Sequence, residues 1–162
     1  MKPIFCLLAL TLASSVFAKD PTFHDYPASV YTGKKAPLVL NKDTRAYKSH
    51  FADLAQNPIN FAGHYAVDLV GCGSGCMIGT VYDAQTGTSQ LLLNRAALSY
   101  CQVGEQHLEM DIEHHANSRL LVITGAVGQN SDCGKHYFIE QQGKLIKIKT
   151  VRYQESDMPT SD

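Results

Sequence analysis

Residues 65–82 read YAVDLVGCGSGCMIGTVY, and this stretch decides the fold. Its two outer runs, residues 65–70 and 77–82, are rich in β-branched and aromatic side chains, which is typical of strands. Glycine, serine and cysteine fill the segment between them, and this composition predicts a turn. Residues 83–87, Asp-Ala-Gln-Thr-Gly, predict a second turn, with Gly87 at a position that needs a positive φ. The chain is therefore expected to fold back on itself as strand, turn and strand.

The same pattern continues toward the C-terminus. Residues 107–113, His-Leu-Glu-Met-Asp-Ile-Glu, alternate polar and apolar side chains, which predicts a strand with one buried face. Further strands are expected at residues 89–93, 119–124, 136–141 and 144–153. Gln142-Gly143 between the last two predicts a hairpin turn.

One helix is expected, ahead of the strand-rich region. Tyr47, Phe51 and Leu54 fall at helical spacing. Asp43 is placed to cap the free amides of the first turn. Pro58 ends the helix, because proline disfavours helical geometry in the residue before it.

Residues 19–42 carry three of the six prolines and predict an extended lead-in, with an edge strand at residues 37–40. Taken together, the elements predict a mainly β fold. We expect an antiparallel sheet or sandwich, or a propeller-like β meander, with one N-terminal helix and disulfide bonds that staple it.

The composition fits one folded domain and excludes several classes of protein. The chain has 162 residues, of which 44% are hydrophobic and 18% charged, so it can bury a core and is not expected to be disordered. Its 14 basic residues against 15 acidic ones argue against nucleic-acid binding, which needs a basic surface. No apolar run reaches the roughly 18 residues that cross a bilayer.

Residues 1–18 predict a secretory signal peptide. One lysine, an apolar stretch and small residues ending at Ala18 match the three parts of such a signal, with cleavage after Ala18. The expected organisation is a signal peptide (1–18), a single β-rich domain (19–154) and a polar tail (155–162). The expected location is the periplasm or the outside of the cell.

Four cysteines remain after cleavage, and an even number in an exported chain predicts two disulfides. Three pairings are possible; we favour Cys72–Cys76, which closes a small loop, and Cys101–Cys133, which ties two later strands together. The alternative, a zinc site that uses Cys72 and Cys76, needs thiolates that an oxidising compartment removes. No metal or other cofactor is expected.

Five short motifs together resemble those of a family of small exported bacterial proteins. They are NFAGHY at residues 60–65, GCGxxC at 71–76, DxxTG at 83–87, SRLLxxxG at 118–125 and GKLxxI at 143–148. The resemblance covers residues 44–150 and implies export and a shared fold. Many relatives carry a bulky aromatic residue before the GCG, where this chain has Leu69-Val70.

In size, compartment and expected fold class, the chain is also similar to immunity proteins. These protect bacteria from cell-wall amidases delivered by type VI secretion, by plugging the active site of the enzyme with a loop. No residue motif carries this likeness, so it suggests a function by analogy of architecture.

Two loops are candidate contact sites for a protein partner. Cys72-Gly73-Ser74-Gly75-Cys76 would be a tight loop with Ser74 at its tip, and it lacks the first glycine of a G-x-S-x-G nucleophile elbow. Residues 128–134 form a polar loop held by Cys133, and a preorganised loop loses less entropy on binding. The expected partner-binding residues are Ser74, Asn130, Ser131 and Asp132.

Other polar residues support weaker alternatives. His64 with Asp68 would suggest a hydrolase, although a histidine at the start of a strand is more often structural. Glu109, Asp111 and Glu113 would share one strand face, as a solvated surface or as an acidic patch. The adjacent residues His114 and His115 are expected to point to opposite faces.

The function expected from the sequence is that of an exported, non-enzymatic protein-binding domain. Its partner would be a peptidoglycan amidase or another cell-wall hydrolase, which it would inhibit by inserting loops into the active site. The alternatives are a periplasmic protein of envelope maintenance or of small-ligand binding, and a hydrolase that uses His64.

Overall fold

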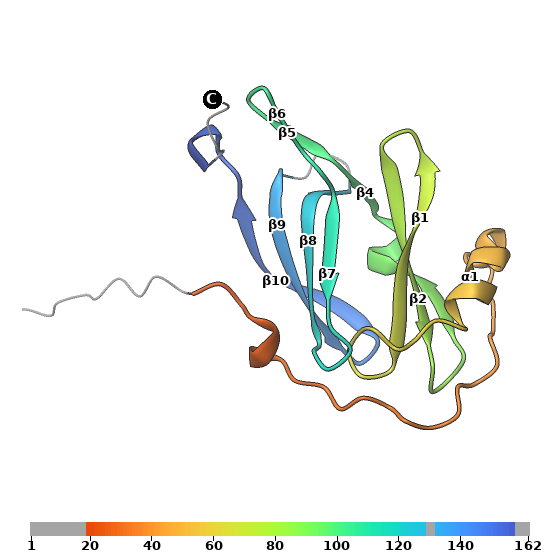
Figure 1. Ribbon diagram of the computed structural model, residues 1–162. Coiled ribbons are helices and arrows are strands. Elements are labelled where there is room, and N and C mark those ends of the chain that lie inside the picture. The colour runs from red at the N-terminus through yellow and green to blue at the C-terminus, as the bar shows by residue number, and fades with distance from the viewer. Residues whose placement is uncertain (1–18, 129–131, 158–162) are drawn as a thin grey trace, which may run out of the picture.

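The computed structural model describes residues 19–128 and 132–157, so the expected signal peptide lies outside the described residues. Antiparallel β-strands are the main regular structure of the described chain, beside one short α-helix, which confirms the predicted fold class (Figure 1). The strands are β1 (Tyr65–Gly73), β2 (Cys76–Asp83), β3 (Ser89–Leu91), β4 (Ala97–Ser99), β5 (Cys101–Val103), β6 (Gln106–Leu108), β7 (Asp111–His114), β8 (Leu120–Val127), β9 (Gly134–Gln141) and β10 (Lys144–Arg152). The helical elements are α1 (Lys48–Leu54) and the 3₁₀ turns η1 (Phe23–Asp25), η2 (Arg45–Tyr47), η3 (Leu92–Arg95) and η4 (Glu155–Asp157). Within the described residues, no helix is long and apolar enough to span a membrane.

Eight of the strands belong to one sheet. Its order is β1-β2-β4-β8-β9-β10, with β3 also paired to β2 and β7 also paired to β8. The strands β5 and β6 form a separate two-stranded sheet. Of the architectures that the sequence left open, the protein therefore adopts a single large antiparallel sheet with a small hairpin beside it.

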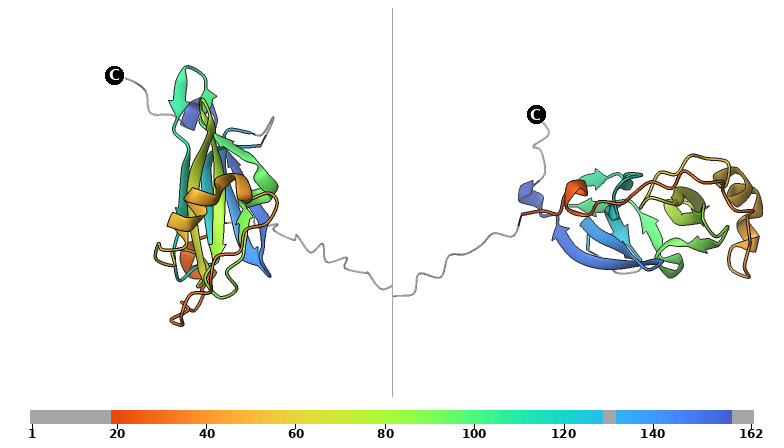
Figure 2. Two further views of the ribbon diagram at one scale, coloured as in Figure 1. Left: turned by 90° about the vertical axis from the view of Figure 1, so that its right-hand side faces the viewer. Right: turned by 90° about the horizontal axis from the view of Figure 1, so that it is seen from below.

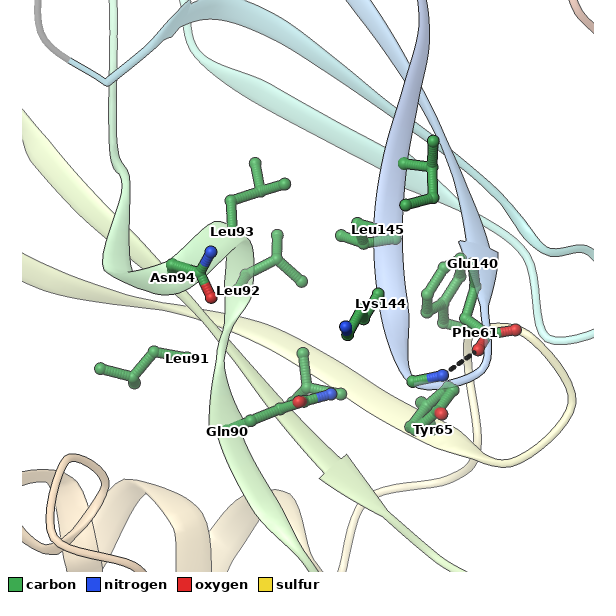
Figure 3. A pocket seen from close by; sticks show the side chains of 13 residues that line it. Phe61, Tyr65, Gln90, Leu91, Leu92, Leu93, Asn94, Glu140, Lys144 and Leu145 are labelled. Atoms are coloured by element: carbon green, nitrogen blue, oxygen red, sulfur yellow. Dashed lines mark hydrogen bonds between the residues drawn. The ribbon is translucent and has the colours of Figure 1, made fainter.

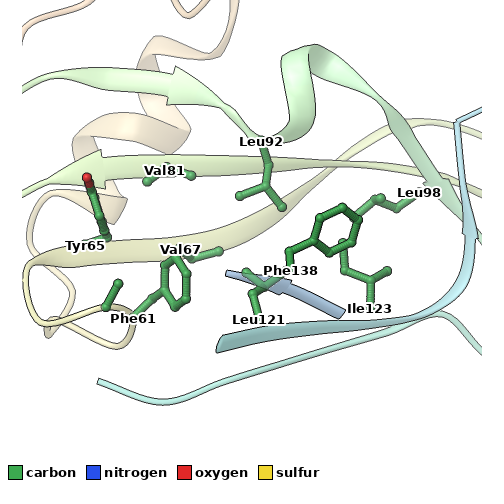
Figure 4. Packing of buried hydrophobic residues seen from close by; sticks show 10 residues of the cluster. Phe61, Tyr65, Val67, Val81, Leu92, Leu98, Leu121, Ile123 and Phe138 are labelled. Carbon is green, nitrogen blue, oxygen red and sulfur yellow. The ribbon is translucent and has the colours of Figure 1, made fainter. Parts of the chain in front are cut away.

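The large sheet curls around its own inner face. In a flat sheet, β1 and β9 would lie about 19 Å apart, because they are four places apart in the strand order. Val67 of β1 and Phe138 of β9 nevertheless belong to the same buried cluster. Figure 4 shows Val67 and Val81 on one wall of this core, facing Leu121 and Phe138 on the other. The curl thus leaves β10 facing the β2–β3 side of the same sheet.

The lead-in, residues 19–42, runs along one end of the curled sheet (Figures 1 and 2). Pro27 bridges to Ser118 just before β8, and Val39 bridges to Thr88 just before β3. The segment is extended as predicted, and it ties the two halves of the sheet together. The edge strand expected at residues 37–40 is reduced to the single bridge at Val39, whose N–H donates to the carbonyl of Gly87 at 2.8 Å.

The helix begins later than predicted, and its expected cap is wrong. Asn41, not Asp43, organises the entry: its side-chain oxygen accepts the backbone N–H groups of Asp43 at 2.8 Å and Thr44 at 3.1 Å. This Asx turn leads into a 3₁₀ turn and then into α1, for which no side-chain cap is present. The apolar stripe was predicted correctly, since Phe51 and Leu54 are almost fully buried.

Two predicted strands are shorter than expected because the chain changes partner. The strand expected at 107–113 is split into β6, which pairs with β5, and β7, which pairs with β8. The strand expected at 89–93 ends at Leu91, where the left-handed residues Leu93 (φ 49°) and Asn94 (φ 55°) turn the chain toward β4. The alternation of polar and apolar residues cannot predict where a strand ends in such cases, because the end depends on which distant strands it pairs with.

The two turns predicted from glycine are confirmed. Gly87 has φ +78°, in the left-handed region, after a turn in which the Asp83 carboxylate accepts the N–H of Gln85 at 2.8 Å. Between β9 and β10, Gln142 and Gly143 both have positive φ, of 51° and 78°. Two such residues form the two-residue hairpin turn that matches the twist of the strands.

Candidate functional site

Both favoured disulfides are present. Cys72 is bonded to Cys76 and Cys101 to Cys133, with Cα–Cα distances of 5.2 and 5.6 Å. The bonds are compatible with a secreted or periplasmic protein. They also remove the thiolates that the zinc alternative required, and no group of three or more metal-ligating side chains lies within the described residues.

The first predicted contact loop is the tip of the β1–β2 hairpin. Gly73 (φ +139°) and Gly75 (φ +66°) turn the chain around an exposed Ser74. A Cβ atom added to Gly75 would lie 2.5 Å from Cε1 of Tyr100, so the tip rests against this ring. No side chain larger than hydrogen fits at Gly75 unless Tyr100 moves.

Of the second predicted contact loop, residues 129–131, which include Asn130 and Ser131, lie outside the described residues. The Asp132 carboxylate pairs with Nε of Arg152 at 2.7 Å, and its carbonyl accepts Nε2–H of His136 at 3.1 Å. His136 is buried, and its Nε2 also faces the Gly125 carbonyl at 3.2 Å. The base of this loop is therefore fixed by an ion pair, a buried histidine and the adjacent disulfide.

The fold brings the bases of these two loops to the same end of the molecule. Tyr100 links them, because it touches Gly75 and directly precedes Cys101, which is bonded to Cys133. The Tyr100 side chain is 52% exposed, and its ring centroid lies 5.8 Å from that of His107 in β6. We call residues 73–75, Tyr100 and Asp132 the disulfide end (Figure 1, top).

Sequence reasoning missed Tyr100. A single tyrosine carries no periodicity, and its contact with the hairpin tip joins residues 25 positions apart. The available signal was its position next to a cysteine that was expected to form a disulfide.

The structure separates His64 from Asp68, the acidic partner suggested for it in the hydrolase alternative. His64 lies just before β1, four residues from Asp68, and four residues of strand span about 13 Å. The Asp68 carboxylate lies 3.9 Å from Nε2 of His50 instead, and that nitrogen contacts the Thr80 hydroxyl at 2.8 Å. The His64 ring packs on Tyr65, with centroids 4.0 Å apart.

The acidic stretch does not form one continuous face. Glu109 lies between β6 and β7, whereas Asp111 and Glu113 lie in β7. Glu113 pairs with Lys135 at 3.5 Å. His114 and His115 do have different surroundings, as expected: Nδ1 of His114 contacts the Asn60 carbonyl at 2.9 Å, while the ring of His115 stacks on η1.

A cavity of about 550 Å³ lies between the β3–η3 segment and the β9–β10 hairpin (Figure 3). Its apolar wall is formed by Phe61, Val81, Leu91, Leu92, Leu93, Leu145 and Ile146. Its polar side chains are Tyr65, Gln90, Asn94, Glu140 and Lys144. The volume lies within the range of small-molecule sites.

Two of the polar side chains in the cavity are buried. Glu140 is 9% exposed, and its Oε1 accepts the backbone N–H of Gly143 at 2.7 Å. Burial raises the pKa of the Tyr65 hydroxyl, and the carboxylates of Glu140 and Asp83 raise this pKa further. At neutral pH the hydroxyl is protonated, as in an ordinary tyrosine, and can donate a hydrogen bond.

The cavity was not predicted from the sequence, although one signal for it exists. Glu140 follows His136 and Phe138 at a spacing of two along β9, and all three are buried. A charged residue in phase with the buried residues of a strand indicates a polar group turned inward.

Comparisons with protein-family models, with curated proteins and with solved structures find no match to this chain.

Proposed function

We propose that this protein is an exported protein-binding domain that inhibits a cell-wall hydrolase and that uses the disulfide end as its contact surface. One observation carries the proposal: both loops singled out in the sequence start from this end, each beside a disulfide, with a half-exposed tyrosine between them. The second loop would contribute Asn130 and Ser131 to the contact.

The physical basis is preorganisation. The Cys72–Cys76 bond closes the first loop at both ends, and the Cys101–Cys133 bond anchors the second loop at one end. A loop held in this way has already lost part of the conformational freedom that binding would remove. Tyrosine is enriched among the residues that dominate binding energy, because its large ring buries apolar area while its hydroxyl still forms a hydrogen bond. Ser74 and Asp132 would add polar contacts around that ring.

The mechanism would be steric occlusion of the catalytic cleft of the enzyme. An end whose loops are held by disulfides suits insertion into a concave active site, as in the immunity proteins that neutralise cell-wall amidases of type VI secretion. A peptidoglycan amidase is the partner that this analogy favours. The analogy rests on size, expected compartment and fold class.

The test is a pull-down with the oxidised chain from residue 19 onward as bait, using envelope extract and the products of neighbouring genes. We expect one-to-one capture of a cell-wall hydrolase whose activity is lost in the complex. Absence of any captured hydrolase under oxidising conditions would overturn the proposal.

Substitutions then locate the contact surface. Tyr100→Ala and Ser74→Arg should each abolish capture. Val39→Ala is the matched control, because Val39 is also an exposed apolar side chain (56%) but lies in the lead-in. Unchanged capture by both of the first two variants would show that another surface binds the enzyme.

A further inference from the structure

The cavity is distinct from the disulfide end. Strand β1 connects the two regions: Tyr65 at its start lines the cavity, and Gly73 at its other end belongs to the hairpin tip. Eight steps along a strand span about 26 Å. A ligand in the cavity would therefore not touch the surface assigned to the protein partner.

The buried polar atoms of the cavity are available to a ligand. The Tyr65 hydroxyl and the second carboxylate oxygen of Glu140 make no hydrogen bond to the described part of the chain. Because no fully buried side-chain nitrogen or oxygen in that part lacks a partner, these two atoms keep some exposed surface. Tyr65 and Glu140 both line the cavity, and Glu140 also borders a second pocket beside Arg119 and Gln142. The nearby Arg119 donates to the backbone carbonyl of Glu140, at 3.4 Å, and forms no ion pair with its carboxylate.

A cation faces the same space without a counter-ion. Lys144 lines the cavity, and Figure 3 shows its ammonium group pointing toward the β3–η3 side. Within the described residues, no carboxylate lies within 4.0 Å of this ammonium group, and the Glu140 carboxylate is also farther away than this. The cavity is therefore lined by one anion, the Glu140 carboxylate, and one cation, the Lys144 ammonium group, which lie too far apart to form a salt bridge with each other.

We infer that this cavity binds a short zwitterionic peptide with apolar side chains. The ammonium group of the ligand would lie at Glu140 and the Tyr65 hydroxyl, and its carboxylate at Lys144. The apolar side chains would pack against Leu91, Leu92, Leu93 and Leu145, and the amides of Gln90 and Asn94 would be available to the peptide bond. A ligand of this kind pairs with both charges at once, whereas a neutral apolar ligand would leave the buried Glu140 carboxylate without an ion-pair partner; Lys144 is exposed and stays solvated in either case.

The cavity size fits this class of ligand. About 550 Å³ lies within the range of small-molecule sites and leaves room for two residues with branched side chains. Leucyl-leucine is therefore a suitable probe.

The experiment is calorimetric titration of the oxidised chain with three probes that differ in charge. They are leucyl-leucine, its N-acetyl derivative without an ammonium group, and its C-terminal amide without a carboxylate. The variants are Glu140→Gln, which keeps an acceptor for the N–H of Gly143, and Lys144→Met. Lys147→Met is the matched control, because Lys147 lies on the same strand but outside the cavity lining.

We expect leucyl-leucine to bind the unchanged protein. Each blocked probe should bind with an affinity lower by a factor of about ten or more. Glu140→Gln should weaken leucyl-leucine and the amide but leave the acetylated probe unaffected. Lys144→Met should weaken leucyl-leucine and the acetylated probe but leave the amide unaffected. Lys147→Met should change none of the three affinities.

Two results would overturn the inference. One is absence of leucyl-leucine binding at concentrations on the order of millimolar. The other is equal binding of all three probes, which would indicate that only apolar contacts are made. Because Ser74→Arg and Tyr100→Ala lie far from the cavity, they should leave peptide binding intact, so this test and that of the proposed function fail independently.

Discussion

Removing the two disulfides one at a time should destabilise the protein by different amounts. A disulfide stabilises mainly by restricting the unfolded chain, and the effect grows with the number of residues in the closed loop. Cys72 and Cys76 are four positions apart, which corresponds to about 2 kcal/mol. Cys101 and Cys133 are 32 positions apart, which corresponds to about 4 kcal/mol.

The assay is urea unfolding of two double variants, Cys72→Ala/Cys76→Ala and Cys101→Ala/Cys133→Ala, beside the unchanged oxidised chain. With a denaturant slope of roughly 2 kcal/mol per molar urea, the midpoints should fall by about 1 M and about 2 M. Circular dichroism at zero denaturant controls for loss of the fold.

The order of the two midpoints decides the outcome. If the first double variant is as unstable as the second, or less stable, the loop-entropy reasoning is wrong for this protein. A changed denaturant slope in either variant would instead indicate a different denatured state, and the comparison would then require calorimetry.

Three further predictions follow from single contacts. Gly75→Ala should shift the Tyr100 ring resonances in NMR spectra, because its Cβ would lie 2.5 Å from that ring. Gly71→Ala, at a position with no atom within 4 Å and no positive φ, should not shift them, and equal shifts would contradict the assigned contact. Burial and a neighbouring carboxylate raise the pKa of Tyr137 from 10.0 to about 12. Its contribution to stability is therefore complete below pH 10 and lost as the pH rises through about 12, so Tyr137→Phe should flatten the alkaline loss of stability in denaturant titrations. Phe138→Ala should cost about 3–5 kcal/mol in urea unfolding, because this ring is 3% exposed at the centre of the core, and a cost below about 1 kcal/mol would show that the core packs differently.

The sequence was sufficient where neighbouring residues determine the structure. The β1–β2 hairpin and the turn at Gln142-Gly143 follow from local composition, and so does the turn that ends at Gly87. The small disulfide loop at Cys72 and Cys76 belongs to the same class, since its two cysteines are close in the chain. In these cases the preference of each residue agrees with the final fold.

The sequence was insufficient where the structure depends on contacts between segments that are far apart in the chain. The break between β6 and β7 exists because one strand pairs with β5 and the other with β8. The contact of Gly75 with Tyr100 and the cavity between η3 and β10 both depend on how the sheet curls. The curl results from packing of side chains across the sheet, and no local pattern reports it.

The placement of the disulfides follows from the placement of the core. Along β1, the first three residues, starting at Tyr65, are buried, and the later residues become half-buried or exposed toward Gly73. Apolar burial therefore stabilises the cavity end of this strand but not its tip. Both disulfides lie at the tip end, where Cys72–Cys76 closes the hairpin and Cys101–Cys133 fixes the segment beneath it. Covalent bonds thus stabilise an end that has little hydrophobic core of its own. This end can therefore be exposed to solvent and still keep a fixed conformation.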